Sequence, residues 1–130
     1  MRAHPREDGS AVVDVVLVSA LVVLLFLIVV QVGLALHVRN VVVAAAAEGA
    51  RYAANADREA ADGQDRTRAA VAGALSSSIA DRLSYSVTQT VGPGGASVIE
   101  VLVTGPLPVV LLPAVPFTLT VRGHALEEQR

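Results

Sequence analysis

The sequence has no cysteine, no tryptophan and no lysine among its 130 residues. Without cysteine, the chain has no disulfide framework, no thiolate nucleophile and no cysteine-based metal site. Aromatic residues make up only 3% of it, so a core must be built from Val, Leu and Ala. All ten basic residues are arginines spread singly along the chain, and the basic surface that nucleic-acid binding requires is missing. We therefore expect no nucleic-acid partner.

Groups that could carry out chemistry are also scarce. The histidines, His4, His37 and His124, are too far apart in sequence to form a metal site by helical or hairpin spacing. The three serines at residues 76–78 have no histidine nearby in sequence to act as the base that a serine nucleophile needs. The sequence also has no phosphate-binding glycine loop and no zinc-protease motif. We expect a protein that is not an enzyme, with no cofactor, metal or small-molecule substrate.

What the sequence does have is one long apolar run, residues 15–36, whose only strongly polar members are Ser19 and Gln31. A helix of about 20 such residues spans the ~30 Å hydrocarbon core of a bilayer. The apolar core of a secretory signal is about 7–15 residues long, which is clearly shorter than this run. His37 and Arg39 then mark the end of the lipid-embedded segment, because basic side chains can reach the headgroups. The run predicts a single membrane span with the lipid bilayer as a partner.

The helical pattern continues past the membrane boundary. Residues 40–56 are mostly alanine and valine, with no proline and a single glycine, and alanine has the best helix propensity. We predict one continuous helix over residues 10–55, a transmembrane and juxtamembrane helix whose alanine-rich C-terminal part is a stalk projecting into water. Glu48 and Arg51 lie one turn apart on it and are predicted to form a solvated pair.

The remaining residues, 56–130, predict a small extracytoplasmic α+β domain. Apolar residues recur every four positions from Val71 to Leu83, which favours an amphipathic helix over residues 65–83. The period then changes to two, and strands over residues 84–91 and 97–104 flank a glycine-rich turn, which is typical of an antiparallel β-hairpin.

A third strand is predicted over residues 117–124. The segment before it contains four prolines between residues 106 and 116, so a second membrane helix is excluded there. The apolar residues 109–112 inside that segment are predicted to fold under the sheet, with a contact to a partner or bilayer as the alternative.

The start of the apolar helix carries the most specific signal. Residues 1–9 form a short polar, leader-like tail, and Asp14 is the only acid at the head of the apolar run. One interpretation is capping, in which Ser10 is the N-cap and Asp14 complements the helix dipole. The other is assembly. If the chain is cut between Gly9 and Ser10, Asp14 becomes the fifth residue of a helix among other apolar helices, where its charge needs a partner such as the new amine of Ser10. We favour assembly.

Three stretches together resemble the TadE-like family of tight-adherence pilus proteins, the pseudopilins of type IVb-like systems: GSAVVDVVLV at residues 9–18, VGLALHVRN at 32–40 and AAEGARYAA at 46–54. The resemblance implies that Gly9 is the last leader residue recognised by a prepilin peptidase. It also implies that Asp14 stands where the family has glutamate, one methylene shorter but with the same charge.

The resemblance implies a minor pseudopilin-like role in assembling a tight-adherence pilus or related secretion apparatus, with other pilin-like subunits as partners. The expected location is the cytoplasmic membrane, crossed once, with the N-terminus cytoplasmic and the C-terminal domain extracytoplasmic. The alternative is an uncleaved single-pass anchor that carries an extracytoplasmic interaction domain. A membrane-anchored enzyme is disfavoured, because no nucleophile, base or metal set converges in the sequence.

Overall fold

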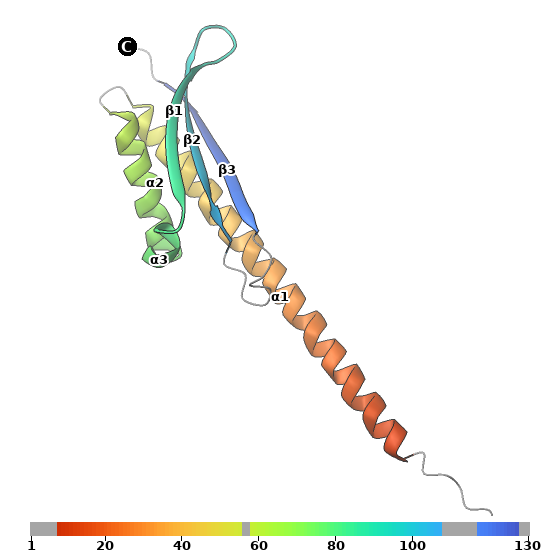
Figure 1. Ribbon diagram of the computed structural model, residues 1–130. Coiled ribbons are helices and arrows are strands. Elements are labelled where there is room, and N and C mark those ends of the chain that lie inside the picture. The colour runs from red at the N-terminus through yellow and green to blue at the C-terminus, as the bar shows by residue number, and fades with distance from the viewer. Residues whose placement is uncertain (1–7, 56–57, 108–116, 128–130) are drawn as a thin grey trace, which may run out of the picture.

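The computed structural model describes residues 8–55, 58–107 and 117–127 (Figure 1). It confirms an α+β protein in which a long apolar helix precedes a shorter helix and a three-stranded antiparallel sheet. In chain order the elements are α1 (Asp8–Ala53), α2 (Ala60–Ala74), α3 (Ser77–Ala80), β1 (Ser84–Val91), β2 (Ser97–Pro106) and β3 (Thr118–Leu126).

Helix α1 is continuous over 46 residues. At 1.5 Å per residue it is about 69 Å long, roughly twice the thickness of a hydrocarbon core. It begins two residues before the predicted start at Ser10. In Figure 1 its N-terminal half extends alone, while its C-terminal half carries all the other elements. One helix therefore serves both the apolar segment and the domain.

One face of the C-terminal half of α1 is buried under the sheet and α2. The opposite face of this half, which includes Val43, is exposed. Only this face agrees with the prediction of a helix that projects into water. Small side chains let a strand approach closely: a Cβ added to Gly123 of β3 would lie 2.4 Å from the carbonyl carbon of Ala46. The alanines predicted as a stalk are thus also the core of the domain. The buried residues of this face are Val38, Val42, Ala45, Ala46, Ala50, Ala53 and Ala54.

Helix α2 packs against α1 at an equally close contact. A Cβ on Gly49 of α1 would lie 2.6 Å from the carbonyl oxygen of Gly63 and 1.8 Å from Oγ1 of Thr67, both on α2. The buried Thr67 hydroxyl donates a hydrogen bond of 2.8 Å to that same carbonyl of Gly63. The hydroxyl is therefore satisfied within α2, and the absence of a side chain on Gly49 makes room for it.

The helix predicted over residues 65–83 is divided in two. Helix α2 ends at Ala74, and α3 starts after Ser76, whose Oγ accepts a hydrogen bond of 3.2 Å from the backbone N–H of Ile79. A serine side chain competes for backbone donors in this way, so it favours a new helix start over continuation of the old one. The apolar stripe is retained across the break, since Val71 and Leu83 are both buried in the core.

The sheet has the order β1-β2-β3 with both pairs antiparallel. The predicted hairpin is present, and Gly94 and Gly95 supply the positive φ angles of its turn, 87° and 81°. On the inner face, Val101 and Val103 of the central strand are fully buried against the helices. The third strand runs slightly further than predicted. The prediction for residues 109–112 lies outside the described residues.

The prediction for Glu48 is wrong in its partner. Its carboxylate accepts hydrogen bonds from Nε and Nη2 of Arg66 on α2, at 2.9 and 2.5 Å, and does not pair with Arg51. The Arg66 and Arg58 guanidinium groups also lie over the ring of Tyr52, 5.9 and 4.7 Å from its centroid. Because α2 packs beside α1, a partner from the second helix replaces the one expected along the first.

Candidate functional site at the N-terminal end of the membrane helix

The apolar half of α1 is surrounded by no other described element. It lies in the one helix of the described residues that is long and apolar enough to cross a membrane, and none of its most apolar window is buried. A helix that is hydrophobic all round needs an apolar environment on every side. This fits a single-pass membrane protein. The large exposed side chains include Leu17, Leu21, Leu25, Phe26, Val29, Val32 and Leu36.

The bond between Gly9 and Ser10 lies in the first turn of α1. Both residues are exposed, and nothing lies within 4 Å of the position that a Cβ on Gly9 would occupy. The first four N–H groups of a helix have no intrahelical acceptor, so this turn opens at little cost in hydrogen bonds. The backbone at this bond is therefore exposed in a turn that can open.

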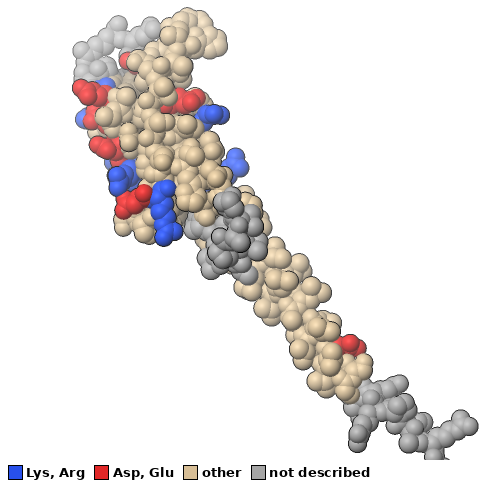
Figure 2. All heavy atoms as spheres, in the orientation of Figure 1, with Lys and Arg blue, Asp and Glu red and all other residues tan. Residues whose placement is uncertain are grey.

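Asp14 is exposed on the same helix, and Ser10 lies four residues before it on the same face. It is the only formally charged residue between residues 9 and 38. Figure 2 shows a red acidic side chain near the N-terminal end of a helix segment that is otherwise tan. A carboxylate inside the hydrocarbon costs about 2.5–3.5 kcal/mol at the bilayer centre, so such residues are normally paired. Within the described residues Asp14 forms no ion pair.

The sheet carries one polar cluster that sequence reasoning missed. On its outer face, Glu100 lies 2.7 Å from Nε2 of His124 and 3.7 Å from Nε of Arg122. The register of β2 with β3 places Glu100 opposite His124, but the connection between these strands is too long for the sequence to fix that register. The described residues contain no group of three or more potential metal ligands. The cluster is a polar network at the surface of the sheet, and no observation on it indicates catalysis.

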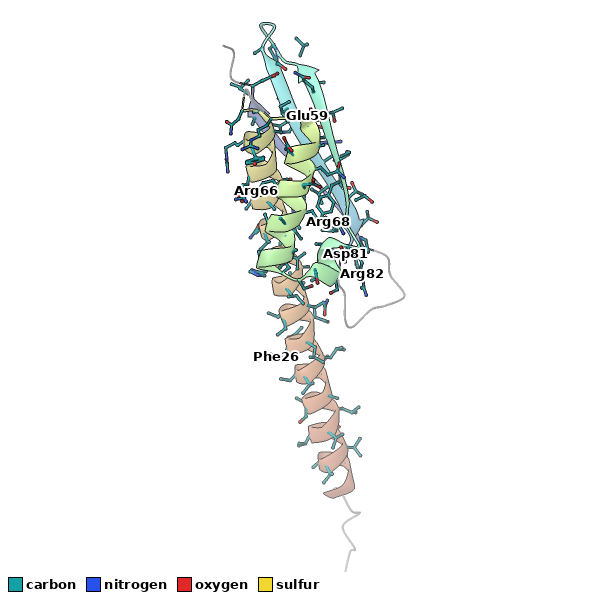
Figure 3. All side chains as sticks on the ribbon, turned by 90° about the vertical axis from the view of Figure 1, so that its left-hand side faces the viewer. Phe26, Glu59, Arg66, Arg68, Asp81 and Arg82 are labelled. Carbon is teal, nitrogen blue, oxygen red and sulfur yellow. The ribbon has the colours of Figure 1, made fainter. Side chains whose placement is uncertain are left out.

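A second polar contact holds α3 at the end of the domain nearest the apolar helix (Figure 3). Arg68 of α2 pairs with Asp81, and that hydrogen bond and charge raise the pKa of Arg68. The Tyr85 hydroxyl donates a hydrogen bond of 2.9 Å to the Ala80 carbonyl, and burial raises the pKa of this phenol. These contacts fix the segment that leads from α3 into β1, including the exposed Arg82.

Gly9, Ser10 and Asp14 all lie in a segment that is similar to a known protein family. The model of the TadE-like protein family matches residues 9–51. This confirms the resemblance seen in the sequence, and the match contains all three candidate residues. The match ends within α1 and does not include the sheet. No curated protein and no solved structure matches the chain.

Proposed function

We propose that this chain is a minor pseudopilin-like component in the assembly of a tight-adherence pilus or a related secretion apparatus. The observation that carries the proposal is the lone carboxylate of Asp14, exposed on an apolar helix inside the TadE-like segment. An unpaired acid is expensive in a bilayer, whereas a bundle of similar helices can offer it a cation. In this proposal the membrane helix is the assembly element and the domain remains outside it.

The proposed sequence of events has two steps. A prepilin peptidase first cuts between Gly9 and Ser10 in the accessible first turn, which releases residues 1–9 and creates a charged amine on Ser10. The helix then enters a bundle of other pilin-like subunits, where the carboxylate of Asp14 pairs with that amine on a neighbouring chain or on its own. Pairing in a low dielectric offsets part of the cost of burying either charge alone.

Cleavage is tested by Gly9→Leu in cells that make the complete pilus apparatus. A peptidase that admits the last leader residue between membrane-embedded groups favours glycine, which has no side chain to exclude. We expect the parent to begin at Ser10 and the variant to remain uncut, as measured by mass spectrometry of the membrane-purified protein.

The matched control is Gly33→Leu, which adds the same side chain to the same helix at another open position. It should be cleaved like the parent. A parent protein that still begins at Met1 in these cells would contradict the proposed mechanism.

The second candidate function is an uncleaved anchor for an extracytoplasmic interaction domain. It is favoured by one observation, that α1 begins at Asp8 and so passes through the proposed cleavage site without interruption. The two functions differ in the N-terminus of the mature protein, which the cleavage experiment measures directly.

Both candidates place the C-terminal domain outside the cytoplasm. The positive-inside rule does not decide the orientation, because Arg2 and Arg6 precede the span and Arg39 and Arg51 follow it. A cytoplasmic N-terminus is part of both proposals. We expect a reporter that is active only outside the cytoplasm to work when fused after Arg130. Activity of a cytoplasmic reporter alone at that position would reverse the orientation.

A further inference from the structure

The apolar segment and the domain core follow each other without a linker. The apolar run ends at Leu36, whose side chain is exposed, and the core begins at Val38, which is only 3% exposed. Val38 and Val42 belong to the same buried cluster as Ala80 and Leu83, which lie at the α3 end of the domain. The transition from a helix surrounded by lipid to a helix surrounded by protein therefore takes about half a turn.

That distance is shorter than the headgroup layer is thick. The hydrocarbon core of a bilayer is ~30 Å and the whole bilayer is about 40–45 Å, so each headgroup layer measures roughly 5–7 Å. At 1.5 Å per residue, this layer spans about four residues beyond Leu36. Val38 falls within this depth and is already covered by the domain. The α3 end of the domain consequently lies at the level of the headgroups.

The charges that face this layer are basic. Arg39 on α1 and Arg82 after α3 are both exposed, and within the described part of the chain neither forms an ion pair. Arg68 and Asp81 neutralise each other beside them. In Figure 3, Arg82 lies at the end of the domain nearest the apolar helix, and the acidic Glu59 lies at the opposite end.

We propose that the membrane-proximal base of the domain, defined by Arg39 and Arg82, binds anionic lipid headgroups. The domain then rests on the bilayer surface and is not held above it. Two observations identify lipid as the ligand. The base of the domain continues directly into the membrane helix, and guanidinium groups bind headgroup phosphates well. The inference rests on membrane insertion of α1, but not on leader cleavage or on the pilus role.

The test uses the full chain reconstituted into vesicles of phosphatidylcholine and phosphatidylglycerol, with trace spin-labelled lipid of each type. The measurement is the preference of the protein for motionally restricted phosphatidylglycerol over phosphatidylcholine. Arg82→Gln should lower this preference about fivefold, the effect expected for one arginine at a charged surface. Arg39→Gln should lower it as well, because its distance from Leu36 alone places it among the headgroups.

The matched control is Arg51→Gln on the same helix. Arg51 is exposed like Arg39 but lies twelve residues, or about 18 Å, further from the membrane, beyond the ~8–10 Å Debye length of physiological salt. The preference should not change in this variant. If Arg82→Gln behaves like Arg51→Gln while Arg39→Gln lowers the preference, the domain stands clear of the bilayer and the proposal is wrong.

A second measurement does not depend on removing a charge. The chain has no cysteine, so a nitroxide can be attached to Ser84→Cys, at the start of β1 next to Arg82, or to Thr90→Cys, about 20 Å further along the same strand. Collision with a water-soluble nickel chelate should be several-fold less frequent at residue 84 than at residue 90. Equal access at both positions would overturn the proposal. Neither measurement requires a peptidase or other subunits, so failure here leaves the proposed function untouched.

Discussion

Replacing Asp14 with alanine is expected to abolish co-purification of the protein with other pilin-like subunits, while the variant still inserts into the membrane. Removing one partner of a buried ion pair costs about 3–5 kcal/mol, because the other charge is left unpaired. Association should therefore fall by about a hundredfold or more. The measurement is quantitative pull-down from membranes of cells that make the whole apparatus, scored for recovered subunits and for the N-terminus of the variant.

Asp14→Glu is the control that separates charge from side-chain shape. Glutamate keeps the carboxylate and adds one methylene, so this variant should assemble like the parent. The helix-capping interpretation predicts a different result. If Asp14 only interacts with the helix dipole, Asp14→Ala loses about 0.3–1 kcal/mol of helix stability and still assembles normally. If Asp14→Ala recovers partner subunits as well as the parent does, the assembly role of Asp14 is wrong and the capping interpretation is correct.

Gly49→Ala is expected to give the largest loss of stability in the domain. The added Cβ would meet Oγ1 of Thr67 and the carbonyl oxygen of Gly63 at distances that no side chain tolerates, so α2 must move away from α1. Overpacking of this kind costs about 1–3 kcal/mol, or roughly 5–20 °C in Tm for a domain of this size. The near-ultraviolet circular dichroism of the two tyrosines follows unfolding, because Tyr52 lies beside α2 and Tyr85 at α3.

The control substitution is Gly73→Ala on α2. Nothing lies within 4 Å of the Cβ that it would add, and alanine is favoured over glycine inside a helix by about 0.5–1 kcal/mol. This variant should melt at or above the temperature of the parent. An unchanged Tm for Gly49→Ala would mean that α1 and α2 are not in backbone contact at this crossing.

Local patterns in the sequence were enough to predict most of the elements. The apolar run with its alanine-rich continuation predicted a single helix, and the α1 boundaries differ from those predicted by two residues at each end. Alternation of side chains and a glycine-rich turn predicted the hairpin. Both signals depend on residues close together in the chain. Of the three stretches that resemble the TadE-like family, residues 9–18 and 32–40 lie within the segment that the family model matches, and residues 46–54 extend three residues beyond its end.

Contacts between distant segments could not be predicted in the same way. The alanines after residue 40 gave a helical signal but no indication of what would cover them, because their small side chains suit close packing as well as exposure. Glu48 has a plausible partner in Arg51 along the helix, and only the docking of α2 brings Arg66 closer. The break at Ser76 was missed because the apolar stripe continues across it, with Leu75 and Ile79 packed against the same core.

The uninterrupted α1 also has a mechanical consequence. The residues that hold the sheet belong to the same rigid rod as the residues that lie in the lipid, so there is no flexible joint between them to absorb motion. Because the helix is continuous, a rotation of α1 about its own axis turns the whole sheet around that axis by the same angle. The direction in which the sheet projects is therefore set by the rotation of α1 about its own axis within the membrane.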